Sequence, residues 1–221
     1  GEEGGVRMTY SENICVCVAA PLLVTARCMG RRYLHLFLFL FAGMASCLLS
    51  AYINTFFAAV FGASAVQATV EIAPVVEEVM KLLPLLFYLL VFEPAPEPIR
   101  PAVLTIAAGF ATFENICYLV QNGAENFTFL LVRGFGTGAM HILCGAVIGY
   151  GLVYVWRRTW LKFTGTFGLL GVSIGLHGIY NLLIAYEGGV QYVAYLLPTV
   201  IVLLGLLAGK LFLPRLGGKD V

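Results

Sequence analysis

Charged residues are scarce in this sequence: only 11% of its 221 residues are Asp, Glu, Lys or Arg, whereas 60% are hydrophobic. A water-soluble domain usually carries about 25% charged residues, so this class of protein is excluded. No run of basic residues is interleaved with aromatic ones, which argues against nucleic acid as a partner. We therefore predict one polytopic membrane domain whose surroundings are the lipid bilayer.

Cysteine is present but follows no framework pattern. The six cysteines are scattered, and Cys15, Cys17 and Cys28 lack the paired second half that a metal-binding knot would need. Cysteine within apolar segments usually behaves as a small hydrophobic residue. We expect that behaviour here.

Six apolar stretches are long enough to cross a bilayer as helices, which takes about 20 residues. They are 34–61, 68–92, 101–121, 128–156, 164–186 and 190–212. A shorter apolar run at 14–26 fits either an extra span or an interfacial helix. The prediction is an all-α polytopic membrane helical bundle with six to seven transmembrane helices. Its parts are an N-terminal tail with this short apolar segment at 1–33, a transmembrane catalytic bundle at 34–213 and a cytoplasmic tail at 214–221.

The basic residues of the loops indicate an orientation. If the span 34–61 begins in the cytoplasm, the cytoplasmic side receives Arg27, Arg31, Arg32, Arg100, Arg157, Arg158, Lys162, Lys210, Arg215 and Lys219. The opposite loops carry Glu125 and Glu187 and no basic residue. Positive charge favours the cytoplasmic side, so we predict a cytoplasmic C-terminus.

The stretch 68–92 is apolar enough to span, yet it carries Glu77, Glu78 and Lys81 in its middle. Each such group costs about 2.5–3.5 kcal/mol at mid-membrane if it is left unpaired. Helical spacing places Glu77 and Lys81 about 40° apart on one face, where opposite charges compensate one another. Pro74 and Pro84 bracket the cluster and loosen the backbone ladder. The cluster predicts a functional site.

Other spans also carry isolated polar residues, namely Glu114, Asn115, His141, His177 and Asn181. Counting residues from the predicted outer ends places Glu77, Glu114, His141 and His177 about 10–20 Å below the outer surface, at about 1.5 Å per residue. We therefore expect four helices to deliver ionisable groups to one layer.

Carboxylates and imidazoles in one layer suit hydrolysis. Glu114, His141 and His177 would form an open zinc site, or a site for another divalent metal, and Glu77 would take a proton from the water that the metal activates. Glu78 would then be a fourth ligand, a partner of a ligand or a partner of Lys81. Without metal, Glu77 would activate water itself, the two histidines would stabilise the oxyanion and Asn181 would orient an imidazole. Lys81, Asn115 and Asn181 are expected to support the site.

Two other functions use the same residues. A proton-coupled transporter could pass protons along a glutamate and histidine relay, and a non-catalytic scaffold could use the polar pairs to hold its helices together. Transport needs a polar route on both sides of the layer. The inner part of one span, residues 82–91, is apolar instead.

These motifs resemble those of the PrsW family of intramembrane proteases. Glu77, Glu78 and Lys81 match its EExxK signature, Phe110 and Glu114 match FxxxE, and His141 and His177 match two later histidine motifs. The resemblance implies a helical bundle that lies in a bacterial plasma membrane. It also implies that this bundle cuts a membrane protein or peptide substrate, similar to anti-sigma factors, in the outer half of the bilayer.

It also implies roles for single residues. Glu77 and Glu78 would be the essential glutamates, and His141 and His177 would be metal ligands or oxyanion partners. The related CAAX endopeptidases carry EExxxR and FxxxH. Here Lys81 lies one position early and Glu114 replaces the histidine, so a prenylated substrate is not expected.

Overall fold

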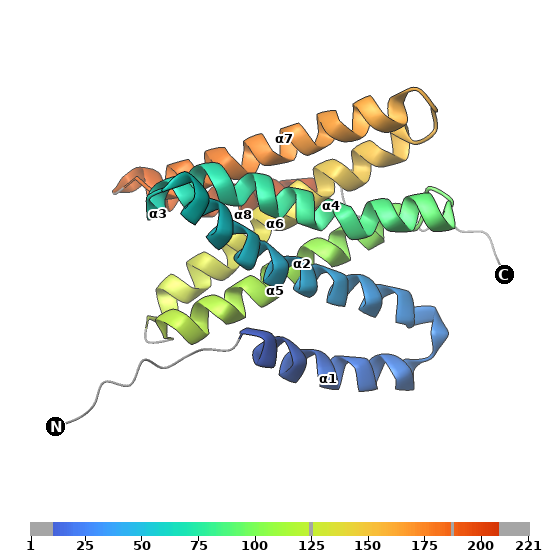
Figure 1. The fold of residues 1–221 in the computed structure, drawn as a ribbon, viewed down its shortest axis with the longest axis horizontal. Coiled ribbons are helices and arrows are strands. Elements are labelled where there is room, and N and C mark those ends of the chain that lie inside the picture. Colours follow the sequence, from blue (N-terminus) through green and yellow to red (C-terminus); the bar gives the residue numbers. More distant parts are fainter. Residues whose placement is uncertain (1–10, 124–125, 187, 208–221) are drawn as a thin grey trace.

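The computed structural model describes residues 11–123, 126–186 and 188–207, which form helices and turns and contain no strand (Figure 1). The long helices are α1 (Ser11–Met29), α2 (Arg31–Phe61), α4 (Ala73–Phe92), α5 (Ile99–Asn122), α6 (Phe127–Val155), α7 (Leu161–Ile184) and α8 (Gly189–Leu207). A single turn, α3 (Ala65–Gln67), and a π-helical segment, η1 (Ala68–Ile72), connect α2 to α4. The prediction of an all-α fold is confirmed. The predicted tail at 214–221 and the first ten residues lie outside the described residues.

Six of these helices are long and apolar enough to cross a membrane: α1, α2, α5, α6, α7 and α8. The sequence of the segment at 14–26 fits either a span or an interfacial helix. In the structure this segment is part of the 19-residue helix α1, which is long and apolar enough to span. Helix α4 has 20 residues but carries three charged side chains, and it contacts α2, α5 and α7 within the bundle. The expected six to seven membrane helices are therefore present.

The start of α4 is irregular because of Pro74. Proline has no N–H, so the carbonyl of Val70 loses its usual helical partner four residues later, and the wider π-helical segment precedes this point. Within it the N–H of Ala73 donates to the carbonyl of Ala68, five residues earlier. The carbonyl of Thr69 is thereby left free for another donor.

Helices α2 and α5 meet backbone against backbone. A Cβ atom on Gly43 would lie 2.0 Å from the carbonyl oxygen of Ile106, and one on Gly109 would lie 2.1 Å from that of Leu40. No larger residue fits at either position without movement of a helix. This contact fixes the position of α5 relative to α2 (Figure 1).

An apolar core fills the bundle on one side of the charged residues of α4. Its buried members come from α4, α5, α6 and α7 and include Leu85, Leu89, Ile106, Ile148 and Leu152. Helix α1 packs against α2 and α5 through a smaller cluster around Met44 and Phe113. The charged residues of α4 adjoin both clusters, because Lys81 precedes Leu82 of the first and Glu77 lines a cavity together with Phe110 and Phe113 of the second.

Candidate active site

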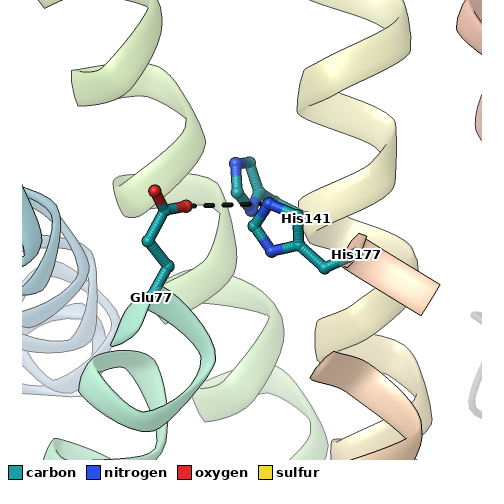
Figure 2. A group of neighbouring side chains, drawn as sticks. All are labelled: Glu77, His141 and His177. Atoms are coloured by element: carbon teal, nitrogen blue, oxygen red, sulfur yellow. Dashed lines mark ion pairs between the residues drawn. The ribbon is translucent and has the colours of Figure 1, made fainter. Parts of the chain in front are cut away.

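Four helices bring ionisable side chains together inside the bundle. Glu77, Glu78 and Lys81 come from α4, and one residue comes from each of the next three helices: Glu114, His141 and His177. Both histidines and Glu78 are almost completely buried. Figure 2 shows Glu77 reaching toward the two imidazoles. The predicted convergence of these residues is thus present in the fold.

Glu78 and Lys81 form the buried centre of the cluster. The ammonium of Lys81 donates to Glu78 Oε1 over 2.6 Å and lies 3.0 Å from His141 Nδ1. The same Glu78 oxygen lies 2.8 Å from His177 Nδ1. Burying a charge is expensive unless it is paired and hydrogen-bonded, and these contacts provide that pairing. Glu78 therefore holds Lys81 and His177 in place.

The contact with Glu78 selects the tautomer of His177. A carboxylate only accepts, so His177 Nδ1 carries the proton and donates it to Glu78. The Nε2 lone pair is then directed toward Glu77, whose Oε2 lies 3.8 Å away. That distance is too long for a direct hydrogen bond. A carboxylate behind the far nitrogen is the arrangement that orients histidine ligands of metals.

His141 is held from both ends of its ring. An ammonium only donates, so Lys81 donates to Nδ1, and His141 Nε2–H donates to Glu114 Oε2 over 2.7 Å. The ring also lies 5.0 Å from that of Phe110 and 5.1 Å from that of His177, centroid to centroid. His141 therefore has one polar contact at each ring nitrogen.

Two further side chains hold the carboxylates, and sequence reasoning missed both. Arg133 donates through Nη2 to Glu114 Oε1 over 3.2 Å, with its guanidinium 3.8 Å from the centre of the Tyr118 ring. Asn54 Nδ2 donates to Glu77 Oε1 over 3.3 Å. Both residues are polar side chains inside otherwise apolar spans, and this feature of the sequence could have indicated their role.

The two supporting asparagines differ from expectation. Asn181 does not orient an imidazole, although the sequence predicted that role. Its side-chain amide donates instead to the free carbonyl of Thr69 over 2.9 Å. This hydrogen bond connects α7 to the π-helical segment that precedes Glu77. Asn115 follows Glu114 on α5, and its buried Oδ1 has no hydrogen-bond partner among the described residues. Its supporting role stays a prediction.

A cavity of about 240 Å³ opens beside the cluster. Its wall includes both cavity-facing carboxylates, Glu77 and Glu114, together with Asn54, Tyr118 and Arg133. On the other side of Glu78 and Lys81, the described residues leave a void of only about 10 Å³ with a mostly apolar lining, room for at most one water. The polar cluster is therefore open on one side and closed on the other.

The donor set fits a divalent metal such as zinc. One ligand atom from each of Glu77, His141 and His177 lies within 4.8 Å of the other two. Two imidazoles and a carboxylate are a common set of three zinc ligands that leaves a coordination position open. His177 offers a free lone pair on Nε2, whereas His141 would offer one on Nε2 only in its other tautomer, with the proton on Nδ1, where the Lys81 ammonium now donates. The carboxylate in this group is Glu77 and not Glu114, the ligand predicted from the sequence.

Comparison with known proteins agrees with the sequence motifs. A family model described as "PrsW family intramembrane metalloprotease" matches residues 30–206, which include every residue of the cluster. A protein named Protease PrsW from Oceanobacillus iheyensis is 30% identical over 99 residues. This match spans 45% of the chain and 44% of the relative, less than half of either. No solved structure matches the chain significantly.

Proposed function

The chain belongs to the PrsW family of intramembrane metalloproteases, and from this premise we propose that it is an endopeptidase cutting membrane-anchored proteins within the bilayer. One observation carries the proposal. Glu77, His141 and His177 bring ligand atoms within 4.8 Å of one another, and Glu77 also lies in the wall of a cavity inside a membrane bundle. A single-span substrate would reach this cavity from the lipid, in keeping with the anti-sigma-factor-like substrates that the resemblance implies.

We assign Glu77, His141 and His177 to the metal. When bound, a divalent metal such as zinc polarises the scissile carbonyl and makes water a stronger acid and hence a nucleophile at neutral pH. Glu78 contributes by keeping the proton on His177 Nδ1, so that Nε2 stays available. Asn54 holds the other oxygen of Glu77 and fixes the direction of its carboxylate.

We assign the proton transfer to Glu114. Its Oε2 lies next to His141 Nε2, its side chain lines the cavity, and Arg133 holds its second oxygen. A carboxylate held in this way can accept the proton of an attacking water and later give it to the leaving amine. The two glutamates thus exchange the roles that sequence analysis gave them, because Glu77 and not Glu114 lies within reach of both imidazoles.

The closed side of the cluster favours hydrolysis over proton-coupled transport. Protons that entered through the cavity would meet the apolar core beyond Glu78 and Lys81, where the described residues leave almost no space. A scaffold without catalytic activity would not need a cavity beside two carboxylates. Hydrolysis uses the cavity to admit the substrate, the two carboxylates for metal binding and proton transfer, and the closed side to limit access by water.

The test combines metal analysis with cleavage of a single-span reporter substrate in nanodiscs. We expect Glu77→Gln, His141→Ala and His177→Ala to lose both metal and cleavage, and a chelator to abolish cleavage by the unmodified chain. Glu114→Gln should keep its metal and lose about 100-fold or more of its turnover, the usual contribution of a general base. Glu71→Gln is the matched control, because Glu71 is exposed on η1 and lies outside the cluster.

Other results would assign the roles differently. Metal retained by Glu77→Gln and lost by Glu114→Gln would restore the roles first predicted from the sequence. Cleavage unaffected by chelation would favour the metal-free mechanism in which Glu77 activates water. Normal cleavage by His177→Ala or Glu77→Gln would end the assignment of this cluster as a protease site.

A further inference from the structure

A second polar hollow lies at the opposite end of α5 from Glu114, where α4 ends, α5 begins, and α6 turns into α7. A cavity of about 520 Å³ is lined by Arg100, Arg157, Glu97 and Tyr150, among others. A neighbouring cavity of about 310 Å³ shares Arg157 and adds Lys162, Trp156 and Glu93. Arg100 precedes Glu114 by 14 residues on α5, which places this hollow about 20 Å from the active site along the helix at about 1.5 Å per residue.

The basic side chains of this hollow lack carboxylate partners. Among the residues that the structure describes, no Asp or Glu oxygen lies within 4.0 Å of Arg100, Arg157 or Lys162. Arg100 Nε is buried and makes no hydrogen bond to any of the residues described. Buried donors are normally satisfied, so an unpaired guanidinium nitrogen at a cavity indicates an acceptor that is supplied from outside the chain.

Aromatic rings position two of these cations. The Arg100 guanidinium lies 4.3 Å from the centre of the Tyr150 ring, and Lys162 Nζ lies 5.2 Å from that of Trp156. Indole and phenol rings concentrate at the membrane interface, where lipid head groups lie. These rings are what a hollow at head-group level would contain, and they restrict the directions of the two cations.

The walls also fit an acyl chain. Apolar side chains line both cavities, and Leu90, in the wall of the smaller one, is 65% exposed on the outside of the bundle. The three cations outnumber Glu93 and Glu97 in the two walls, so the hollow carries a net positive charge. A soluble acidic peptide would match the charge but would leave the apolar surface uncovered.

We propose that this hollow binds an anionic phospholipid, with the phosphodiester between Arg100 and Arg157 and an acyl chain along the apolar wall beside Leu90. Basic pockets between membrane helices bind anionic head groups through the same pairing of phosphate with arginine. The bound lipid would supply the acceptor that the Arg100 side chain lacks. It would also connect the ends of α4, α5, α6 and α7, the four helices that carry the proposed active site.

Tryptophan fluorescence offers a direct test, because both tryptophans of the chain, Trp156 and Trp160, lie at this end. The Trp160→Phe variant leaves Trp156 as the only tryptophan. In nanodiscs, brominated phosphatidylglycerol should quench Trp156 more strongly than brominated phosphatidylcholine. Replacing Arg100 and Arg157 together by Gln should weaken apparent phosphatidylglycerol binding by about fivefold per residue, or about 25-fold in all. Arg158→Gln, adjacent but absent from both walls, should keep the preference.

Three results would overturn the proposal. The first is equal quenching by the two lipids, and the second is an unchanged lipid preference in the double variant that still unfolds cooperatively. The third is displacement of phosphatidylglycerol by millimolar inorganic phosphate or by a soluble acidic peptide, which would show a site for that ligand instead. None of these results depends on the proteolytic activity assigned to the Glu77 cluster, so the proposed function is tested independently.

Discussion

Lys81 is the residue on which the buried charges of the site depend. It contacts Glu78 and His141 at the same time, and all three side chains are excluded from solvent. The EExxK motif therefore does more than supply two glutamates. Its lysine compensates the glutamate that orients His177.

We predict that Lys81→Met lowers the free energy of unfolding by about 3–5 kcal/mol, because removing one partner of a buried ion pair leaves the other charge uncompensated. Denaturant unfolding in detergent micelles would measure the change. Arg158→Met is the control and should have little effect, because Arg158 is exposed and forms no ion pair among the described residues.

The double variant Glu78→Gln/Lys81→Met makes this test specific. It removes both charges, so it should be more stable than Lys81→Met alone. If the double variant were as unstable as the sum of the two single variants, the Glu78 and Lys81 charges would not be coupled, and the account of the buried centre would be wrong.

At the scale of the helix, backbone contact places α5, and with it Glu114, against α2. Gly43 and Gly109 each lie where a Cβ atom would meet a carbonyl of the other helix. Close approach of this kind needs glycine in membrane bundles. A methyl group at either position would therefore displace the whole of α5.

We predict that Gly43→Ala destabilises the bundle by about 1–3 kcal/mol, the usual cost of overpacking, and lowers cleavage because α5 must move away from α2. Thermal unfolding and reporter cleavage would measure the two effects. Gly171→Ala is the matched control: it adds the same methyl group to α7, where nothing lies within 4 Å, and should be neutral or slightly stabilising. Equal effects of the two substitutions would show that the contact between α2 and α5 is not tight.

At the scale of the whole molecule, the turns between the helices lie at two ends of the bundle (Figure 1), and these two ends differ in charge. Arg100, Arg157, Arg158 and Lys162 lie where α5 and α7 begin and α6 ends. At the other end, the described turn residues 62–64, 123, 185–186 and 188 include no Lys or Arg. From the positive-inside rule we predict that the basic end faces the cytoplasm and that the cavity beside Glu77 lies nearer the outer surface.

We predict that a cysteine introduced at Thr159 in a cysteine-free background is protected from a membrane-impermeant maleimide in intact cells. A cysteine introduced at Ala65, between α2 and α4, should be labelled. Both positions are exposed in the structure, so the difference would report the side of the membrane and not burial. The reverse pattern would invert the orientation and place the proposed lipid site on the outer side.

Much of the fold could be predicted from the sequence, because a bilayer leaves few options. With no water to satisfy backbone groups, apolar stretches of about 20 residues must become helices, and their lengths fix their ends to within a few residues. Charged groups are costly in lipid unless they are paired, so the sequence also predicted that the ionisable residues of the spans form one site. These residues are Glu77, Glu78, Lys81, Glu114, His141 and His177. Those conclusions follow from composition and spacing.

Which atom faces which could not be predicted, because it depends on the rotation of each helix and on close contacts between helices distant in sequence. The backbone contact at Gly43 and Gly109, the carbonyl of Thr69 freed by Pro74, and the side chains of Asn54 and Arg133 together orient the carboxylates. They place Glu77, and not Glu114, beside both imidazoles. The sequence alone determined that acidic and imidazole groups share one membrane layer, since burying them separately would cost too much. Only the tertiary structure decided which carboxylate joins the histidines, since that choice depends on distances of a few ångströms.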